Sequence, residues 1–215
     1  MLLASMIDKM YGFFTSGGVF MIPLVICSLV ALTYILERGL SLRRSLVIQE
    51  DLLRAIDVMP IGGSISEIEK LSYMRSTSLA RLVCKCLDHI PWSKAENMES
   101  LQTSARAEAM LLERGLVILE ICVGIGPLLG LLGTVSGLIF IFQGVGNSGG
   151  ITEGIVIAKG ISEALNATVA GLVIAIPSLI AHSYYSKKVE VMMAELESAC
   201  MDLLIKIYMK NGSES

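Results

Sequence analysis

Three long apolar stretches of the chain contain no Asp, Glu, Lys or Arg, and polar segments lie between and around them. They cover residues 10–36, 121–152 and 164–186. Each is long enough for a helix to cross a hydrocarbon core of about 30 Å, which takes roughly 20 residues. Lipid offers backbone amides no hydrogen-bond partner, and the alternation typical of barrel strands is absent, so the crossings should be helical. The pattern therefore predicts three membrane helices, at about 18–36, 121–143 and 160–182.

The polar region between the first two spans has helical spacing with two interruptions. The first helix should continue directly from the first span and end at "MPIGG", residues 59–63, where Pro60 and two glycines break it. A second block should begin near Ser66, pause near "HIPWS" and resume. That last segment contains no breaker before Gly115, which predicts one long helix entering the second span.

After the third span, apolar residues recur at helical spacing and predict an amphipathic extension of the same helix. They include Met192, Leu196, Ala199 and Leu203. The whole chain, 1–215, is thus expected to be one all-α integral membrane domain. Its parts are the first span at 18–36, a helical region at 37–114, the second span at 115–145, a loop at 146–154, the third span at 155–185 and a tail helix at 186–215.

Composition agrees with a membrane protein, and the distribution of charge sets its orientation. The chain is 53% hydrophobic with a mean hydropathy of +0.69, beyond the usual range of soluble domains. Of 17 Lys and Arg, 11 lie between Arg38 and Arg114 and four lie after His182. The positive-inside rule predicts that both regions are cytoplasmic, with the N-terminus and the loop outside. Because charge is segregated by side, the net charge of −3 does not suggest a nucleic-acid partner.

Enzymatic chemistry finds no support in the sequence. It shows no nucleophile–base pair and no phosphate-binding loop, and the five cysteines are not placed for disulfides in an oxidising compartment. The "CKCLDH" segment lacks the spacing and the second ligand cluster of a structural zinc site. We therefore expect no catalytic residue, cofactor or metal.

Small residues form a stripe along each of the last two spans. On an ideal helix Gly126, Gly130, Gly133 and Gly137 fall within about 60° of one another, and the third span has a matching stripe that includes Gly160 and Gly171. In lipid, apolar side chains gain little by meeting, so close backbone approach is a principal means of helix association. The stripes predict tight packing on a neighbouring helix, and that packing alone would account for them.

Polar side chains beside the stripes favour a further role. Thr134 and Thr168 should lie at similar depth on adjacent helices, with Glu163 and Asn166 near them, as in the lining of an ion pathway. Glu163 is either a proton-linked carboxylate or an interfacial acid that reaches water, and ideal geometry places it about 140° from Thr168. Asn166 either forms a hydrogen bond across a subunit interface or packs within its own subunit with its polar groups satisfied there.

Two motifs resemble those of the MotA/TolQ/ExbB proton-channel family. The segment "GPLLGLLGTVSGL" is similar to the family's "APLLGLLGTVWGM" type, and "GISEALNATVAGLVIAIPSLIAHSYY" to its "GIAEALIATAAGLAVAIPAVLAYNYF" type. The motifs occur in the family's order and are separated by a short loop. The short chain resembles ExbB or TolQ more than flagellar MotA. Ser136 and Asn166 depart from the pattern, which has a large residue and an aliphatic residue at these places.

The resemblance implies a pentamer of three-span subunits around two single-span helices of an ExbD/TolR-like partner, in the bacterial inner membrane. Such a complex uses the proton gradient for periplasmic or outer-membrane work such as transport, and a TonB/TolA-like protein is a further candidate partner. Thr134 and Thr168 match the family's pore-facing threonines, and Glu163 matches a functionally important acid. The alternatives are a non-conducting membrane scaffold and a MotA-like flagellar stator subunit. Membrane lipid is also an expected partner of the chain.

Overall fold

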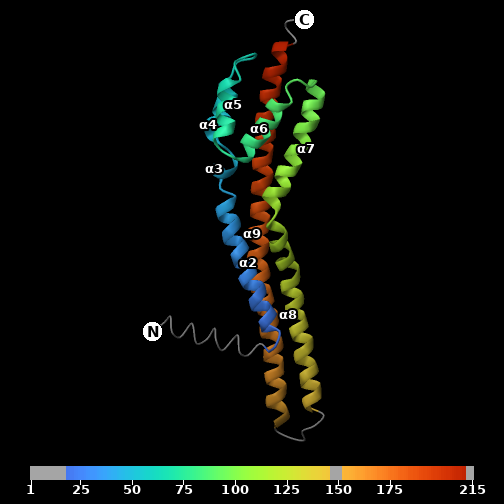
Figure 1. Ribbon diagram of the computed structural model, residues 1–215. Coiled ribbons are helices and arrows are strands. Elements are labelled where there is room, and N and C mark those ends of the chain that lie inside the picture. The colour runs from blue at the N-terminus through green and yellow to red at the C-terminus, as the bar shows by residue number, and fades with distance from the viewer. Residues whose placement is uncertain (1–17, 146–151, 212–215) are drawn as a thin grey trace, which may run out of the picture. The chain divides into compact units, whose positions relative to one another are not determined.

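The computed structural model describes residues 18–145 and 152–211, and all regular structure in these two ranges is helical. The N-terminal residues 1–17, predicted to lie outside the cytoplasm, and most of the predicted loop at 146–154 fall outside these ranges. The helices, labelled in Figure 1, are α2 (Met21–Ser41), α3 (Arg44–Val47), α4 (Glu50–Val58), α5 (Ser66–Met74), α6 (Ser78–Asp88), α7 (Lys94–Glu113), α8 (Leu116–Val145) and α9 (Thr152–Asn211).

Three of these helices are long and apolar enough to cross a membrane. Their candidate spans are Met21–Ser41, Leu116–Gln143 and Ile157–Met209. This result confirms the three-span prediction, because the second and third candidates contain the predicted crossings and the first overlaps the predicted 18–36 from Met21 onward. A span that carries large apolar side chains on its outward faces is normal in lipid.

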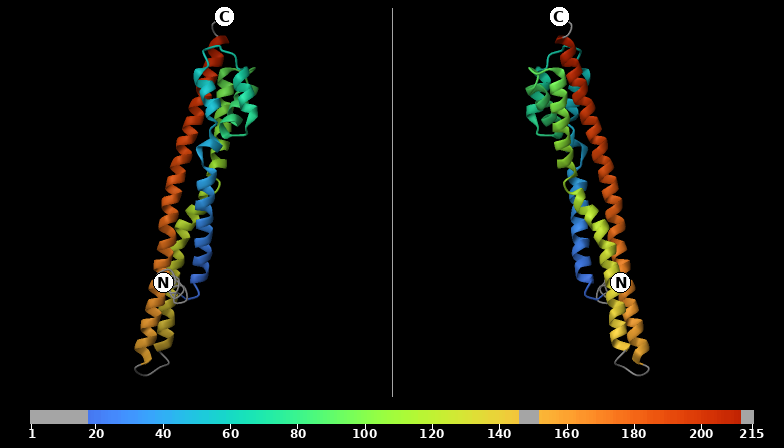
Figure 2. Two further views of the ribbon diagram at one scale, coloured as in Figure 1. Left: turned by 90° about the vertical axis from the view of Figure 1, so that its left-hand side faces the viewer. Right: turned by 90° about the vertical axis from the view of Figure 1, so that its right-hand side faces the viewer.

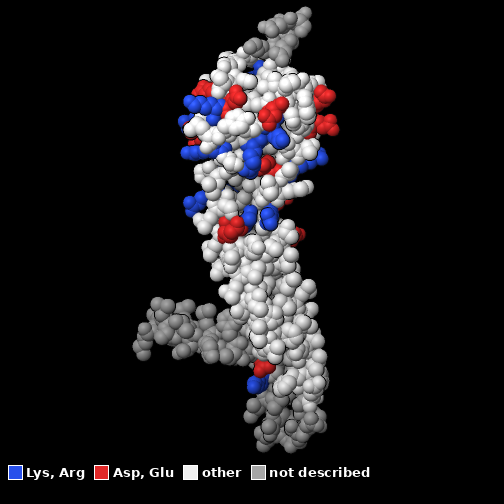
Figure 3. Space-filling model, viewed as in Figure 1, with Lys and Arg blue, Asp and Glu red and all other residues white. Residues whose placement is uncertain are grey.

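The chain divides into two compact units, each with its own set of contacts. One, here called the span unit, combines the chain up to Leu36 with Leu116–Ser183. The other, here called the charged unit, combines Glu37–Gly115 with Tyr184–Ser215. On the face drawn in Figure 3, the Lys, Arg, Asp and Glu side chains gather over the charged unit, and the span unit is almost entirely uncharged. The single domain expected from the sequence stays a prediction.

In the span unit, α8 and the first half of α9 run side by side in all three views (Figures 1 and 2). Helix α2 packs against this pair through Met21 and Leu24, which form a cluster with Ala170. Leu129 of α8 and Ile174 of α9 pack against the same cluster. One side of the α8–α9 pair is therefore covered by α2.

In the charged unit, short helices pack in sequence and the second half of α9 completes their core. Helix α5 contacts α4 and α6, and α6 contacts α7. The α9 residues Met192, Leu196, Ala199 and Leu203 are all buried, which confirms the predicted amphipathic extension. Lys206 Nζ donates hydrogen bonds to the carbonyls of Ile56 (2.8 Å) and Asp57 (3.0 Å) at the end of α4.

Both predicted interruptions of the polar region are confirmed. Helix α4 ends at Val58 and α5 begins at Ser66, and between them Gly62 has a φ of 72°, which favours glycine. The turn is fixed by a bond from the Gly62 amide to the Lys206 carbonyl, 3.0 Å. The second gap falls between α6 and α7. The additional break before α6 was not predicted; there the Thr77 side chain caps the helix by accepting from the Ala80 amide at 3.2 Å.

The prediction of one helix from the first span to "MPIGG" is wrong. Helix α2 ends at Ser41, and the chain then forms α3 and α4. On one straight helix Val47 would lie about 140° from both Leu42 and Leu52, so the three could not share a buried face. Breaking the helix allows all three to be buried, each with an exposed fraction of 2% or less.

The prediction of one helix running into the second span is also wrong. Helix α7 ends at Glu113, a turn follows, and α8 begins at Leu116. A Cβ on Gly115 would lie 2.5 Å from Nε of Arg38, whose Nη1 also donates to the Leu112 carbonyl at 3.3 Å. The guanidinium therefore occupies the space beside Gly115 and satisfies one of the carbonyls that the end of α7 leaves free.

Candidate functional site

The small-residue stripes of the second and third spans face each other within one chain. All six stripe glycines named from the sequence are buried between α8 and α9: Gly126, Gly130, Gly133, Gly137, Gly160 and Gly171. A Cβ on Gly130 would lie 3.0 Å from the Ala167 carbonyl oxygen and from the Thr168 Cα, and one on Gly133 would overlap the Ala167 Cβ. The two backbones approach so closely that no larger residue fits. The seam is thus a contact inside a subunit.

Thr168 and Thr134 both lie around the Gly130 carbonyl. The Thr168 hydroxyl donates to Gly130 O across the helix pair at 3.3 Å. The amide four residues further along an α-helix bonds the same carbonyl, and here that residue is Thr134. The Thr134 hydroxyl donates to the Leu131 carbonyl of its own helix at 2.6 Å. Both side chains are half-buried. The structure therefore brings the two predicted threonines together, and the carbonyl they share was not foreseen from the sequence.

The two threonines share the side of the α8–α9 pair that α2 leaves open. On α9, Ala170 and Ile174 contact α2, and they lie about 160° and 120° from Thr168 around an ideal helix. On α8, Leu129 faces α2 and lies about 140° from Thr134. The remaining half-buried surface of the threonines is available to a neighbouring helix.

Glu163 lies on the opposite side, next to the start of α2. A Cβ on Gly18 would lie 3.7 Å from Glu163 Oε2, and the φ of Gly18 is 69°. The carboxylate is thus close to the turn that begins α2, where the first backbone amides of the helix give a partial positive charge. Asn166 is half-buried and lies about 60° around the helix from Glu163. Glu163 therefore lies apart from the threonines, in agreement with the angle of about 140° between Glu163 and Thr168 expected for an ideal helix.

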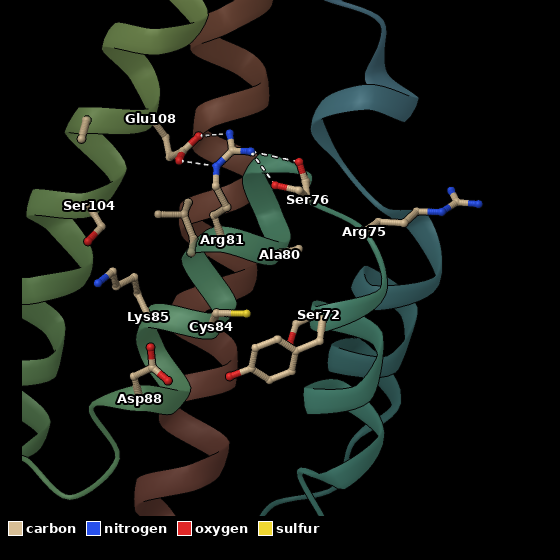
Figure 4. A pocket seen from close by; sticks show the side chains of 13 residues that line it. Ser72, Arg75, Ser76, Ala80, Arg81, Cys84, Lys85, Asp88, Ser104 and Glu108 are labelled. Atoms are coloured by element: carbon tan, nitrogen blue, oxygen red, sulfur yellow. Dashed lines mark hydrogen bonds and ion pairs between the residues drawn. The ribbon is translucent and has the colours of Figure 1, made fainter.

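The charged unit contains a pocket of about 470 Å³ between α5, α6 and α7, and most of the residues that line it are polar or charged. Figure 4 shows that Arg81 of α6 crosses to Glu108 of α7 at its upper edge. The guanidinium donates to both carboxylate oxygens, Nε at 2.7 Å and Nη2 at 2.6 Å, and Nη1 donates to the Ser76 carbonyl at 2.9 Å. No local pattern in the sequence links residues 27 positions apart, so this pair was missed.

Acidic neighbours shift the pKa of two groups in this pocket. The hydrogen bond to Glu108 raises the pKa of Arg81. The negative charge of Asp88 raises the pKa of Tyr73. Lys85 extends toward Ser104 of α7, and Arg75 points away from the other labelled side chains (Figure 4). The pocket therefore has mixed charge around one strong ion pair.

A capping box begins α7. The Ser93 hydroxyl accepts from the Glu96 amide at 3.3 Å, and Glu96 Oε2 accepts from the Ser93 amide at 2.9 Å. The hydrogen bond from the Ser93 hydroxyl, followed by that from its amide, lowers the pKa of Glu96. This arrangement fixes where α7 starts after the "HIPWS" break.

Comparison with known proteins identifies the family. A model of the MotA/TolQ/ExbB proton channel family matches residues 76–198. This range includes α6, α7, α8 and the part of α9 that carries the threonine and the stripe, so it contains the whole threonine site.

Several curated relatives are named as biopolymer transport proteins. ExbB-like 1 of Synechocystis is 33% identical over 169 residues, which cover 78% of this chain and 66% of that protein, just under two thirds. ExbB1 of Vibrio cholerae is 30% identical over 178 residues, covering 81% of this chain and 78% of that protein. ExbB of Helicobacter pylori is 43% identical over 81 residues, covering 38% of this chain and 55% of that protein.

Proposed function

Because the chain belongs to the MotA/TolQ/ExbB proton channel family, we propose that it is the channel subunit of a complex that uses the proton gradient to drive transport. The names of its ExbB-like relatives support this role. We further propose that five copies assemble in the bacterial inner membrane around two single-span helices of an ExbD/TolR-like partner. In this arrangement the charged unit is cytoplasmic, and a TonB/TolA-like protein receives the work.

The observation that carries the proposal is the pair of threonines around the Gly130 carbonyl. Thr134 and Thr168 lie on the open side of α8–α9, and each keeps part of its surface exposed. A hydroxyl that donates to a backbone carbonyl still has lone pairs with which to accept a bond from water or from a protonated acid. Two such hydroxyls on adjacent helices provide polar partners in an otherwise apolar span.

A proton path also needs a group that titrates near the middle of the membrane. Within the spans predicted from the sequence, at 18–36, 115–145 and 155–185, the carboxylates are Glu120 and Glu163, and no Asp occurs. Glu120 is exposed on α8, roughly 21 Å along the helix from Thr134. Glu163 lies on the α2 side, away from the threonines. We therefore propose that the titrating carboxylate comes from the partner helix and that Thr134 and Thr168 solvate it, since an unsolvated charge there costs at least about 2.5–3.5 kcal/mol.

Valine substitution of the threonines tests this path, because it removes the hydroxyl and keeps the shape. Proton flux is measured in proteoliposomes that contain the chain and its co-encoded single-span partner. We expect Thr134→Val together with Thr168→Val to abolish partner-dependent flux while the partner still co-purifies. Thr33→Val is the matched control, because the Thr33 hydroxyl donates to the Leu29 carbonyl of its own helix, α2, at 2.7 Å.

The outcomes separate the candidate functions. Flux that is lost in the double valine variant and kept in the Thr33 variant supports the threonine path. Full flux in the double variant contradicts it, and equal flux without any partner contradicts a carboxylate supplied in trans. A chain that binds its partner but conducts in no variant, wild type included, would instead be a structural scaffold.

A further inference from the structure

An open groove of about 510 Å³ lies in the charged unit between α3 and the first turns that α9 contributes to this unit. Its lining combines three cationic side chains with apolar and aromatic ones. The residues are Arg44, Tyr184, Lys187, Lys188, Val191 and Met192, joined at one end by Glu195. Tyr184 and Val191 are 62% and 57% exposed, whereas Met192 is buried. The groove therefore offers an apolar floor beside a cationic rim.

Among the described residues, two cations of the rim form ion pairs that are partly or largely exposed to solvent. Arg44 contacts Glu195, and Lys187 bonds Glu190 Oε2 at 2.9 Å with both side chains more than two-thirds exposed. Exposed pairs of this kind contribute little, so the cations can turn to another anion at small cost. Lys188 adds a third positive charge to the lining. A phosphate in the groove would meet more positive than negative charge.

The sequence places this groove next to a membrane surface. Residues 164–186 of α9 carry no Asp, Glu, Lys or Arg, and Lys187 is the first charged residue after them. The span that ends here brings Lys187 and Lys188 to the level of the lipid headgroups, and tyrosine is enriched at that level. A ligand with a phosphate and an acyl chain would match both the cationic rim and the apolar floor.

We propose that the groove formed by Arg44, Tyr184, Lys187, Lys188, Val191 and Met192 binds an anionic phospholipid, with the phosphate at the lysines and an acyl chain along Val191. The lipid belongs to the leaflet next to the charged unit. Basic pockets at the cytoplasmic side of membrane proteins recognise anionic headgroups by the same chemistry. The site is independent of the threonine path, so either proposal can fail while the other stands.

Lipid binding is measured by native mass spectrometry of the full chain in detergent. The probes are phosphatidylglycerol, phosphatidylcholine and inorganic phosphate, each added in a titration. The test variant carries Lys187→Gln and Lys188→Gln, and the matched control carries Lys70→Gln and Lys94→Gln. The control changes the charge equally at two exposed lysines of α5 and α7 outside the groove.

Each lysine near a membrane surface favours anionic lipid by about fivefold, so the test variant should bind phosphatidylglycerol roughly twenty-five-fold more weakly. The control should bind it like the wild type, and raising the salt concentration should weaken wild-type binding. Equal binding of phosphatidylglycerol and phosphatidylcholine, or an unchanged affinity in the test variant, would overturn the proposal. Displacement of bound lipid by equimolar inorganic phosphate would also overturn it, because the groove would then select a free anion. A test variant that loses subunits from the oligomer but keeps its lipid would assign the groove to a protein contact.

Discussion

Replacing Gly171 by alanine should destabilise the span unit. A Cβ at this position would lie 2.5 Å from the carbonyl oxygen of Gly126, 3.2 Å from its carbonyl carbon and 3.3 Å from the Gly130 Cα. All three are backbone atoms of α8, so no side chain can turn away to make room. Ordinary contact begins near 3.4 Å, so the two helices must move apart by about 0.9 Å at this level.

The cost of this separation follows from the packing of the seam. Adding a methyl group to a well-packed interior typically costs about 1–3 kcal/mol. The cost should not fall to zero by local adjustment, because the other seam glycines, on either side of Gly171, are equally close to the opposite helix. Gly124→Ala on α8 is the matched control, since a Cβ there meets nothing within 4 Å. Alanine is also the better helix former, so this control should be neutral or slightly stabilising.

The reactivity of Cys122 measures the effect inside the span unit. This thiol is 4% exposed, and it donates to the Cys27 carbonyl at 3.9 Å. In a chain whose other four cysteines are alanine, labelling of Cys122 by a thiol reagent requires the helices to open. A destabilisation of 1–3 kcal/mol should make labelling about 5- to 150-fold faster in Gly171→Ala. Labelling of this variant at the rates of the parent and of the Gly124 control would refute the close approach of the two backbones.

Three further predictions concern the charged unit and the orientation. Arg81→Met should lower the free energy of unfolding by about 1–3 kcal/mol, because it leaves the nearly buried Glu108 carboxylate without its partner. Adding Glu108→Met to the same chain should restore part of this loss. Chemical denaturation of both variants measures the two effects. Because the pKa of Glu96 is lower in the folded chain than its usual 4.5, its stabilisation is present above that pH and is lost as the pH falls through the folded value. Melting temperatures should thus fall less on acidification in Glu96→Gln than in the wild type. An impermeant thiol reagent added outside cells should label Ser148→Cys, which lies outside the described residues, and spare Thr103→Cys; the reverse pattern would invert the proposed orientation.

The membrane helices were predictable because the property that selects them is local. A charge-free stretch of sufficient length must pair its own backbone in lipid, whatever surrounds it. The break at "MPIGG" and the buried face of the tail were predictable for the same kind of reason, since a proline, paired glycines and a repeat of apolar residues act within a few turns. The family motifs also lie within single helices, and the family comparison confirms them.

Two of the missed breaks depend on the burial of side chains and on contacts between distant residues, unlike the break before α6, which the local Thr77 cap sets. Gly115 ends a helix because Arg38, far away in the sequence, occupies the space beside it. The chain between α2 and α4 bends, and the bend allows Leu42, Val47 and Leu52 all to be buried. Neither effect leaves a signal in the local pattern, because the pattern specifies what can form a helix but not what a neighbouring segment requires.

The sequence by itself determined the angle of each stripe, threonine and carboxylate around its own helix axis, because 100° per residue needs no partner. It therefore separated Glu163 from Thr168 before any fold was known. Only the tertiary structure decided that the two glycine stripes face each other in one chain and that both threonines lie around the Gly130 carbonyl, on the side that α2 leaves open. The physical reason is that a helix with a smooth face can pack against any other smooth face, and the choice among them is made by the three-dimensional fit of backbones and of the helix that covers them.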